Sequence, residues 1–148
     1  MNRQLYTIGL YLLSPVIFVY FLYRGIKEPR YLKHFSERLG LLPSQPLDSN
    51  KLNESKSNKN TKTILIHCAS VGEIKASIPL IKRLSQESKL SHLIITNTTP
   101  TGREETEKLI KSLSEENPHG INISSFYLPI DWPISCRRFL KILQINLG

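Results

Sequence analysis

The chain has 148 residues, and its 20 Lys and Arg against 12 Asp and Glu give a formal net charge of +8. This length fits one ordinary domain, and the charge favours an anionic partner such as nucleic acid, an acidic membrane surface or a phosphorylated substrate. Cys68 and Cys136 lie far apart, with no further Cys or His at metal-ligand spacing, so neither a zinc site nor a disulfide framework is predicted.

An uncharged apolar run occupies the amino end. It extends from Leu5 to Tyr23, and a helix of that length covers roughly the hydrocarbon thickness of a bilayer. Pro15 is expected either to kink this helix or to turn it into a re-entrant hairpin. A cleaved signal peptide is the alternative, but the run is longer than a usual signal-peptide core and no small-residue cleavage pattern follows. We therefore expect a retained membrane helix.

Basic residues directly follow this helix. Arg3 alone precedes it, whereas five lie downstream: Arg24, Lys27, Arg30, Lys33 and Arg38. The positive-inside rule then places the body of the protein in the cytoplasm, where these residues can contact anionic headgroups. A merely solvated basic face is the alternative, but it does not explain why the cluster adjoins the apolar run. Residues 1–42 are predicted to be an anchor with a basic juxtamembrane segment.

The segment from Pro43 to Lys62 is polar, with only Leu47 and Leu52 apolar, and is predicted to be a flexible linker or loop. Residues 63–148 alternate strand and helix patterns. This alternation predicts an α/β domain with a Rossmann-like parallel sheet and flanking helices. The expected strands are 63–69, 92–98 and about 121–128, and the expected helices follow Glu73, begin near Arg103 and cover 132–143 with Ile134, Phe139, Leu140 and Leu143 on the apolar side.

Two helix details are predicted. Pro79 lies within the first helical pattern, so that helix either kinks there or begins late with Ser77 as its cap. The second helix carries acidic residues early and has two i, i+4 pairs in the favourable order, Glu104 with Lys108 and Glu107 with Lys111.

Three polar loops are expected at the carboxyl ends of the strands, where ligands of parallel sheets bind: 70–73, 98–102 and 129–131. Gly72 permits close approach of a ligand or an unusual backbone angle. Glu73 would be held charged by the helix dipole, which suits a resting base, but acidic residues in a first turn are also common stabilisers. Asp131 could be a helix cap, and Thr101 with Gly102 a turn and a cap.

Common nucleotide motifs are missing from the sequence. Neither GxxxxGK[ST] nor GxGxxG follows any predicted strand, which argues against a phosphate-loop enzyme or a dinucleotide-binding dehydrogenase. Aromatic residues gather in the apolar run instead of alternating with basic residues, so nucleic-acid binding is not expected either.

The order of these motifs resembles the amino-terminal part of the bacterial 3-deoxy-D-manno-octulosonic acid (Kdo) transferases. The resemblance covers nearly the whole chain: an apolar anchor, a basic stretch ending in SERLGLLP, then HCASVGE, ITNTTPTGRE and YLPID followed by RRFLKIL. It implies the amino-terminal half of an inverting GT-B glycosyltransferase, without metal or cofactor, at the cytoplasmic face of the bacterial inner membrane. The implied reaction moves Kdo from CMP-Kdo to the lipid A precursor, lipid IVA, in lipopolysaccharide biosynthesis.

The resemblance also implies residue roles. The family's proposed general base falls on Glu73 of the SVGE motif, which would deprotonate the acceptor hydroxyl. Ser70 and Gly72 would shape the acceptor pocket, and Thr101, Gly102 and Asp131 would line its edge.

Two departures from the family pattern qualify these expectations. The 43–62 connection is longer than usual in the family. The sequence also lacks two parts that follow in the family: a segment with a further functional carboxylate, and the donor domain that binds the CMP-sugar. The chain is therefore expected to be a fragment that is inactive alone and needs a separate carboxyl-terminal domain. The alternative is an inactive remnant, or a membrane-tethered module that binds anionic lipid without catalysis.

Overall fold

The computed structural model describes residues 3–42, 62–87, 90–116 and 121–143. It divides into two compact units, one formed by Met1–Leu42 with Pro129–Gly148 and the other by Pro43–Leu128. The linker expected at 43–62 lies, apart from Lys62, outside the described residues.

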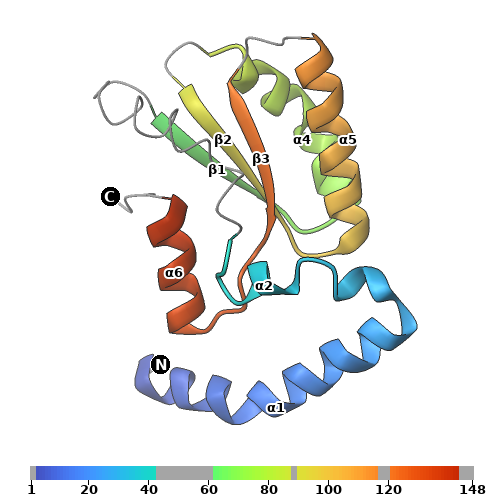
Figure 1. Ribbon diagram of the computed structural model, residues 1–148. Coiled ribbons are helices and arrows are strands. Elements are labelled where there is room, and N and C mark those ends of the chain that lie inside the picture. The colour runs from blue at the N-terminus through green and yellow to red at the C-terminus, as the bar shows by residue number, and fades with distance from the viewer. Residues whose placement is uncertain (1–2, 43–61, 88–89, 117–120, 144–148) are drawn as a thin grey trace. The chain divides into compact units, whose positions relative to one another are not determined.

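The second unit is built on a three-stranded parallel sheet (Figure 1). Its strands β1 (Lys62–Cys68), β2 (Leu90–Asn97) and β3 (Asn122–Tyr127) follow one another in the order β1-β2-β3. β2 is buried on both faces, which explains why its middle, residues 93–95, is continuously apolar. The expected α/β class and parallel sheet are confirmed, with strand ends within two residues of their predicted positions.

Two helices, α4 (Val71–Ser85) and α5 (Pro100–Glu116), connect these strands and cover the same face of the sheet (Figure 1). A sheet that grows in one direction by right-handed crossovers places successive helices on one face. The core between helices and sheet consists of Cys68, Ile74, Ile81, Leu90, Leu93, Ile95 and Leu113, with half-buried aliphatic residues around it.

α4 begins immediately after β1. Ser70 is its N-cap, because the Ser70 hydroxyl accepts a hydrogen bond from the Glu73 amide. Pro79 consequently lies inside the helix, where its side chain is exposed. The alternative of a late start with Ser77 as cap is wrong, and the Ser77 hydroxyl donates instead to the Ile74 carbonyl within the helix.

α5 begins three residues before the predicted start at Arg103. The Thr99 hydroxyl accepts from the Gly102 amide, and Pro100 occupies the first helical position, where its missing N–H costs nothing. The glutamates therefore lie beyond the first turn. Their ion pairs also differ from the prediction: Glu107 pairs with Arg103 at 2.8 Å, and Lys108 pairs with Glu105 at 3.6 Å.

The first unit contains the amino-terminal helix α1 (Arg3–Lys27). It runs without interruption through Pro15, so the re-entrant hairpin is not what the structure adopts. Pro15 cannot donate to the Tyr11 carbonyl, and the Ser14 hydroxyl donates to that carbonyl instead, at 2.7 Å. By length and composition Leu5–Lys27 could cross a membrane, with a mean hydropathy of 1.9.

Short helices complete the first unit: η1 (Pro29–Tyr31), α2 (Phe35–Arg38) and α6 (Pro133–Leu143). Gly40 has a φ of 75°, and a Cβ there would lie 2.2 Å from the Ser135 carbonyl oxygen, so only glycine fits against α6. α6 buries Phe139 and Leu143 as expected. Ile134 does not join this buried side and is 53% exposed, because it lies well round the helix from Phe139.

Candidate functional site

Glu73 occupies the third position of α4, on the loop that follows β1. Its carboxylate accepts two hydrogen bonds, from the Ala69 amide at 2.9 Å and from the Ser70 hydroxyl at 3.2 Å. The Glu73 amide in turn donates to the Ser70 oxygen at 3.3 Å. These reciprocal bonds form a variant of the capping box, in which the Glu73 carboxylate accepts from the amide one residue before the cap. They hold the exposed carboxylate in one orientation at the amino end of the helix.

This geometry serves two roles at once. The capping box stabilises the start of α4, as the structural interpretation of the sequence proposed. A carboxylate has about four lone-pair positions, so Glu73 can accept a further proton or hydrogen bond while both local bonds remain. The arrangement thus suits a group that receives a proton from a bound hydroxyl.

Gly72 lies beside Glu73 in open space. A Cβ built on Gly72 would meet only the Ser70 hydroxyl oxygen, at an ordinary 3.8 Å. Its backbone is not in the left-handed region, so the unusual backbone angle considered for it is not present. Among the residues that the structure describes, no neighbour of Gly72 requires glycine, which leaves close approach of a ligand as the remaining interpretation.

Thr101 and Gly102 form the first turn of α5. Gly102 is buried, and a Cβ there would lie 3.0 Å from the Thr99 hydroxyl oxygen and 3.7 Å from the Ala69 carbonyl oxygen. Gly102 therefore lets α5 pack closely against the loop after β1. Thr101 is exposed, and its hydroxyl lies 3.5 Å from that of Thr99.

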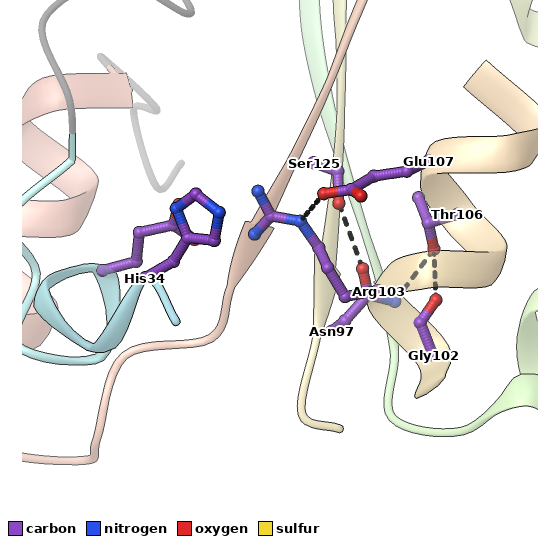
Figure 2. A network of polar contacts seen from close by, with 8 residues as sticks. His34, Asn97, Gly102, Arg103, Thr106, Glu107 and Ser125 are labelled. Carbon is purple, nitrogen blue, oxygen red and sulfur yellow. Dashed lines mark hydrogen bonds and ion pairs between the residues drawn. The ribbon is translucent and has the colours of Figure 1, made fainter. Parts of the chain in front are cut away.

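Asn97, at the end of β2, links the carboxyl ends of all three strands (Figure 2). Its side-chain amide donates to the Cys68 carbonyl at 3.1 Å and to the Thr106 hydroxyl at 3.0 Å, and its oxygen accepts from Ser125 at 3.2 Å. The Thr106 hydroxyl in turn donates a hydrogen bond to the Gly102 carbonyl at 3.0 Å. Asn97 is fully buried, so it is the residue that fixes the loops after β1 and β2 relative to each other.

Sequence reasoning did not identify Asn97, because it was counted as part of the second strand. The available signal was a polar residue directly after the apolar run LIIT, at the sheet edge where ligands bind.

Arg103 was also missed. Its Nε lies 2.8 Å from a Glu107 oxygen (Figure 2). Its guanidinium lies over the Tyr127 ring, 5.2 Å from the centroid.

Asp131 belongs to the first unit, whereas the other five predicted site residues belong to the second. Its carboxylate accepts from the Tyr6 hydroxyl at 2.5 Å and lies 3.8 Å from the Cys136 sulfur. These three residues share a hollow of about 500 Å³ between the amino ends of α1 and α6, lined also by Thr7, Leu10, Pro133, Arg137 and Leu140.

Burial and the neighbouring Asp131 carboxylate raise the pKa of the Cys136 thiol above its ordinary value. A raised pKa means less thiolate at any given pH, so we expect slow alkylation of Cys136 by iodoacetamide. In a Cys68→Ser background, the pH midpoint of the rate should lie above 9.0, the usual value. Asp131→Asn should lower that midpoint only in part, because the burial remains. A midpoint at or below the usual value would contradict this geometry.

Within the described ranges, no group of three or more His, Cys, Asp or Glu side chains is arranged to hold a metal ion. The described edge of the sheet presents the Glu73 carboxylate and the hydroxyls of Ser70, Thr99 and Thr101.

A parallel α/β unit with polar loops at the carboxyl edge of its sheet is the architecture of enzymes that bind a ligand at that edge. Residues 33–148 match the family model of the 3-deoxy-D-manno-octulosonic-acid transferases (kdotransferases). The chain therefore belongs to this glycosyltransferase family and corresponds to its amino-terminal portion.

Two curated relatives have the same name, 3-deoxy-D-manno-octulosonic acid transferase. The protein from Haemophilus influenzae is 31% identical over 147 residues, which are 99% of this chain and 30% of the relative. The protein from Bordetella pertussis is 27% identical over 144 residues, 95% of this chain and 29% of the relative. The chain thus spans less than a third of the length of either relative. No solved structure gives a significant match.

Proposed function

We propose that this chain forms the acceptor-binding half of a Kdo transferase. The complete enzyme would transfer Kdo from CMP-Kdo to lipid IVA, the lipid A precursor, in lipopolysaccharide biosynthesis. The chain covers only about 30% of its relatives, and the CMP-sugar would be bound by a carboxyl-terminal domain corresponding to the rest of their length. The whole would be a GT-B enzyme that inverts the anomeric centre without a cofactor.

The observation that carries this proposal is the orientation of Glu73. Its exposed carboxylate is fixed by the Ala69 amide and the Ser70 hydroxyl, beside the open space over Gly72. An acceptor sugar in that space would bring a hydroxyl to Glu73. The carboxylate would take the hydroxyl proton while the oxygen attacks the anomeric carbon of Kdo, and the bond to CMP breaks as the new glycosidic bond forms.

The remaining predicted site residues form the acceptor pocket or its border in this proposal. Ser70 and Gly72 shape the pocket, and Thr101 with Gly102 borders it through the close packing of α5 on the loop after β1. Asp131 is proposed at the outer edge of the acceptor site. Membrane attachment through α1, with the catalytic unit in the cytoplasm at the inner membrane, would bring this site to an anionic lipid surface.

A chimera tests the proposal. Residues 1–148 would replace the matching segment of the Haemophilus influenzae relative, and the purified chimera would be assayed with CMP-Kdo and lipid IVA. We expect Kdo transfer that the remainder of the relative cannot perform alone. A folded, membrane-bound chimera without transfer would contradict the proposal and favour a non-catalytic lipid-binding module.

Gly72→Ala gives a separate test of the acceptor pocket. Alanine is the better helix former and meets no obstruction here, so the free energy of unfolding should stay level or rise by up to about 1 kcal/mol. The added methyl group should nevertheless lower Kdo transfer by the chimera by at least about tenfold, because it displaces the acceptor. Thermal unfolding and transfer rate are measured on the same samples. Unchanged transfer would remove Gly72 from the pocket.

A further inference from the structure

α1 contacts other residues of its unit near both of its ends. At its amino end, the Tyr6 hydroxyl donates to Asp131. Near its carboxyl end, the Phe21 ring lies 5.6 Å from Phe35 and 5.1 Å from the Arg38 guanidinium, measured at the ring centroid. The two contacts are joined through the chain, because the Ile130 amide, next to Asp131, donates to the Arg38 carbonyl at 2.8 Å.

One stripe of α1 is covered along the length of the helix. Half-buried or buried residues recur every three or four positions, on one helical face: Thr7, Leu10, Ser14, Ile17, Phe21 and Gly25. Most of the other side chains on α1 are exposed and apolar, including Leu12 at 74% and Ile26 at 79%. The helix therefore has one less exposed stripe, and a broad exposed apolar surface over the rest of its circumference.

These contacts are incompatible with α1 standing across a bilayer. Tyr6 and Arg24 are separated by about 27 Å along a helix, close to the roughly 30 Å thickness of the hydrocarbon core. If Arg24 lay at the cytoplasmic surface, Tyr6 would lie near the opposite one. Asp131 and the neighbouring Arg137 would then have to enter the hydrocarbon to keep their places beside Tyr6, which is unfavourable for charged side chains.

α6 adds a basic surface next to the amino end of α1. Pro133–Leu143 contains no acidic residue, and Arg137, Arg138 and Lys141 are exposed. Ile134 is exposed among them at 53%. A helix face that combines basic side chains with an exposed isoleucine complements the boundary between anionic headgroups and acyl chains.

We propose that α1 and α6 together form a surface that lies in the plane of an anionic lipid leaflet, with α1 parallel to the membrane. Tyr6 and Arg24 of α1 bond to Asp131 and Tyr31 of the same unit, and the exposed apolar side chains of α1 enter the leaflet. This inference rests on the membrane attachment in the proposed function but replaces a spanning helix by an in-plane one.

Topology labelling tests the orientation of α1. A single cysteine replaces Asn2 in the full chain with Cys68→Ser and Cys136→Ser, and a second chain carries Ser114→Cys on α5 as the reference. Both are treated with an impermeant maleimide in spheroplasts and in inverted inner-membrane vesicles. We expect both positions to react only in the inverted vesicles. Labelling of position 2 in spheroplasts would overturn the proposal, because α1 would then cross the membrane.

Contact of α6 with the leaflet is tested with an environment-sensitive fluorophore, nitrobenzoxadiazole. It is attached at Ile134→Cys or at Ser114→Cys in the same chain lacking Cys68 and Cys136. In vesicles containing phosphatidylglycerol, the emission at position 134 should shift to the blue and that at position 114 should not. An unshifted position 134 would overturn the role of α6. Neither labelling result depends on catalysis. If α1 proves to span the membrane, the chimera can still transfer Kdo. If the chimera proves inactive, the in-plane orientation of α1 is still supported by the labelling.

Discussion

Replacing Glu73 by glutamine in the chimera is expected to lower the rate of Kdo transfer by about 10²- to 10⁴-fold, the usual contribution of a general base. Glutamine keeps the size of the side chain and an oxygen that accepts from the Ala69 amide. It also keeps the capping box, which uses Glu or Gln at this position. What it loses is the ability to take the acceptor proton, so the activity should fall while the unfolding temperature changes little.

Ser70→Ala is the matched control. It removes the N-cap and one of the two hydrogen bonds to Glu73, and should cost about 0.5–2 kcal/mol of stability. Because it keeps the carboxylate and its bond from the Ala69 amide, it should reduce transfer less than Glu73→Gln. Single-turnover rates and thermal unfolding of the two variants separate the roles. If Glu73→Gln retained full activity, Glu73 would be only a helix stabiliser.

Asn97→Ala is expected to have the largest effect on folding, lowering the free energy of unfolding by about 2–4 kcal/mol. The substitution removes three side-chain hydrogen bonds. The Cys68 carbonyl and the Thr106 and Ser125 hydroxyls each lose their bond to the buried Asn97 side chain. Folded domains have only about 5–15 kcal/mol of stability, so this loss should be evident in urea unfolding.

Two further variants sharpen that measurement. Asn97→Asp keeps the acceptor for Ser125 but loses both amide donors, and its buried carboxylate should have a raised pKa. Its stability should therefore be higher below the pKa of an unfolded Asp and be lost as the pH rises through the folded pKa. Asn122→Ala, at the other end of the sheet, is the control and should cost under about 1 kcal/mol. Equal effects of Asn97→Ala and Asn122→Ala would refute the linking role of Asn97.

The parallel sheet could be predicted because its signal is strong and local. Apolar β-branched runs such as LIIT recur between helical patterns, and parallel strands joined by helices have few alternative arrangements. The cluster of Ser70, Glu73 and Gly102 at one sheet edge followed from the same rule. The capping box was implicit in the spacing of Ser70 and Glu73, although the sequence alone left the role of the carboxylate open.

Other features depended on contacts that are distant in sequence. The start of α5 was misplaced because Pro100 and Gly102 usually mark a turn, whereas here Thr99 caps the helix and Gly102 packs against the Ala69 carbonyl. The contact of Tyr6 with Asp131 joins residues 125 positions apart, and no local pattern encodes it. For the same reason an apolar run of spanning length could not reveal that both of its ends contact one unit.

If this chain is the acceptor half of a divided active site, it should bind the acceptor lipid in the absence of the donor domain, and equilibrium binding to the chain measures this. The 148-residue chain is placed in lipid nanodiscs and titrated with lipid IVA and, separately, with CMP-Kdo. We predict saturable binding of lipid IVA that Gly72→Ala weakens, and no binding of CMP-Kdo. Binding of CMP-Kdo without binding of lipid IVA would contradict the account.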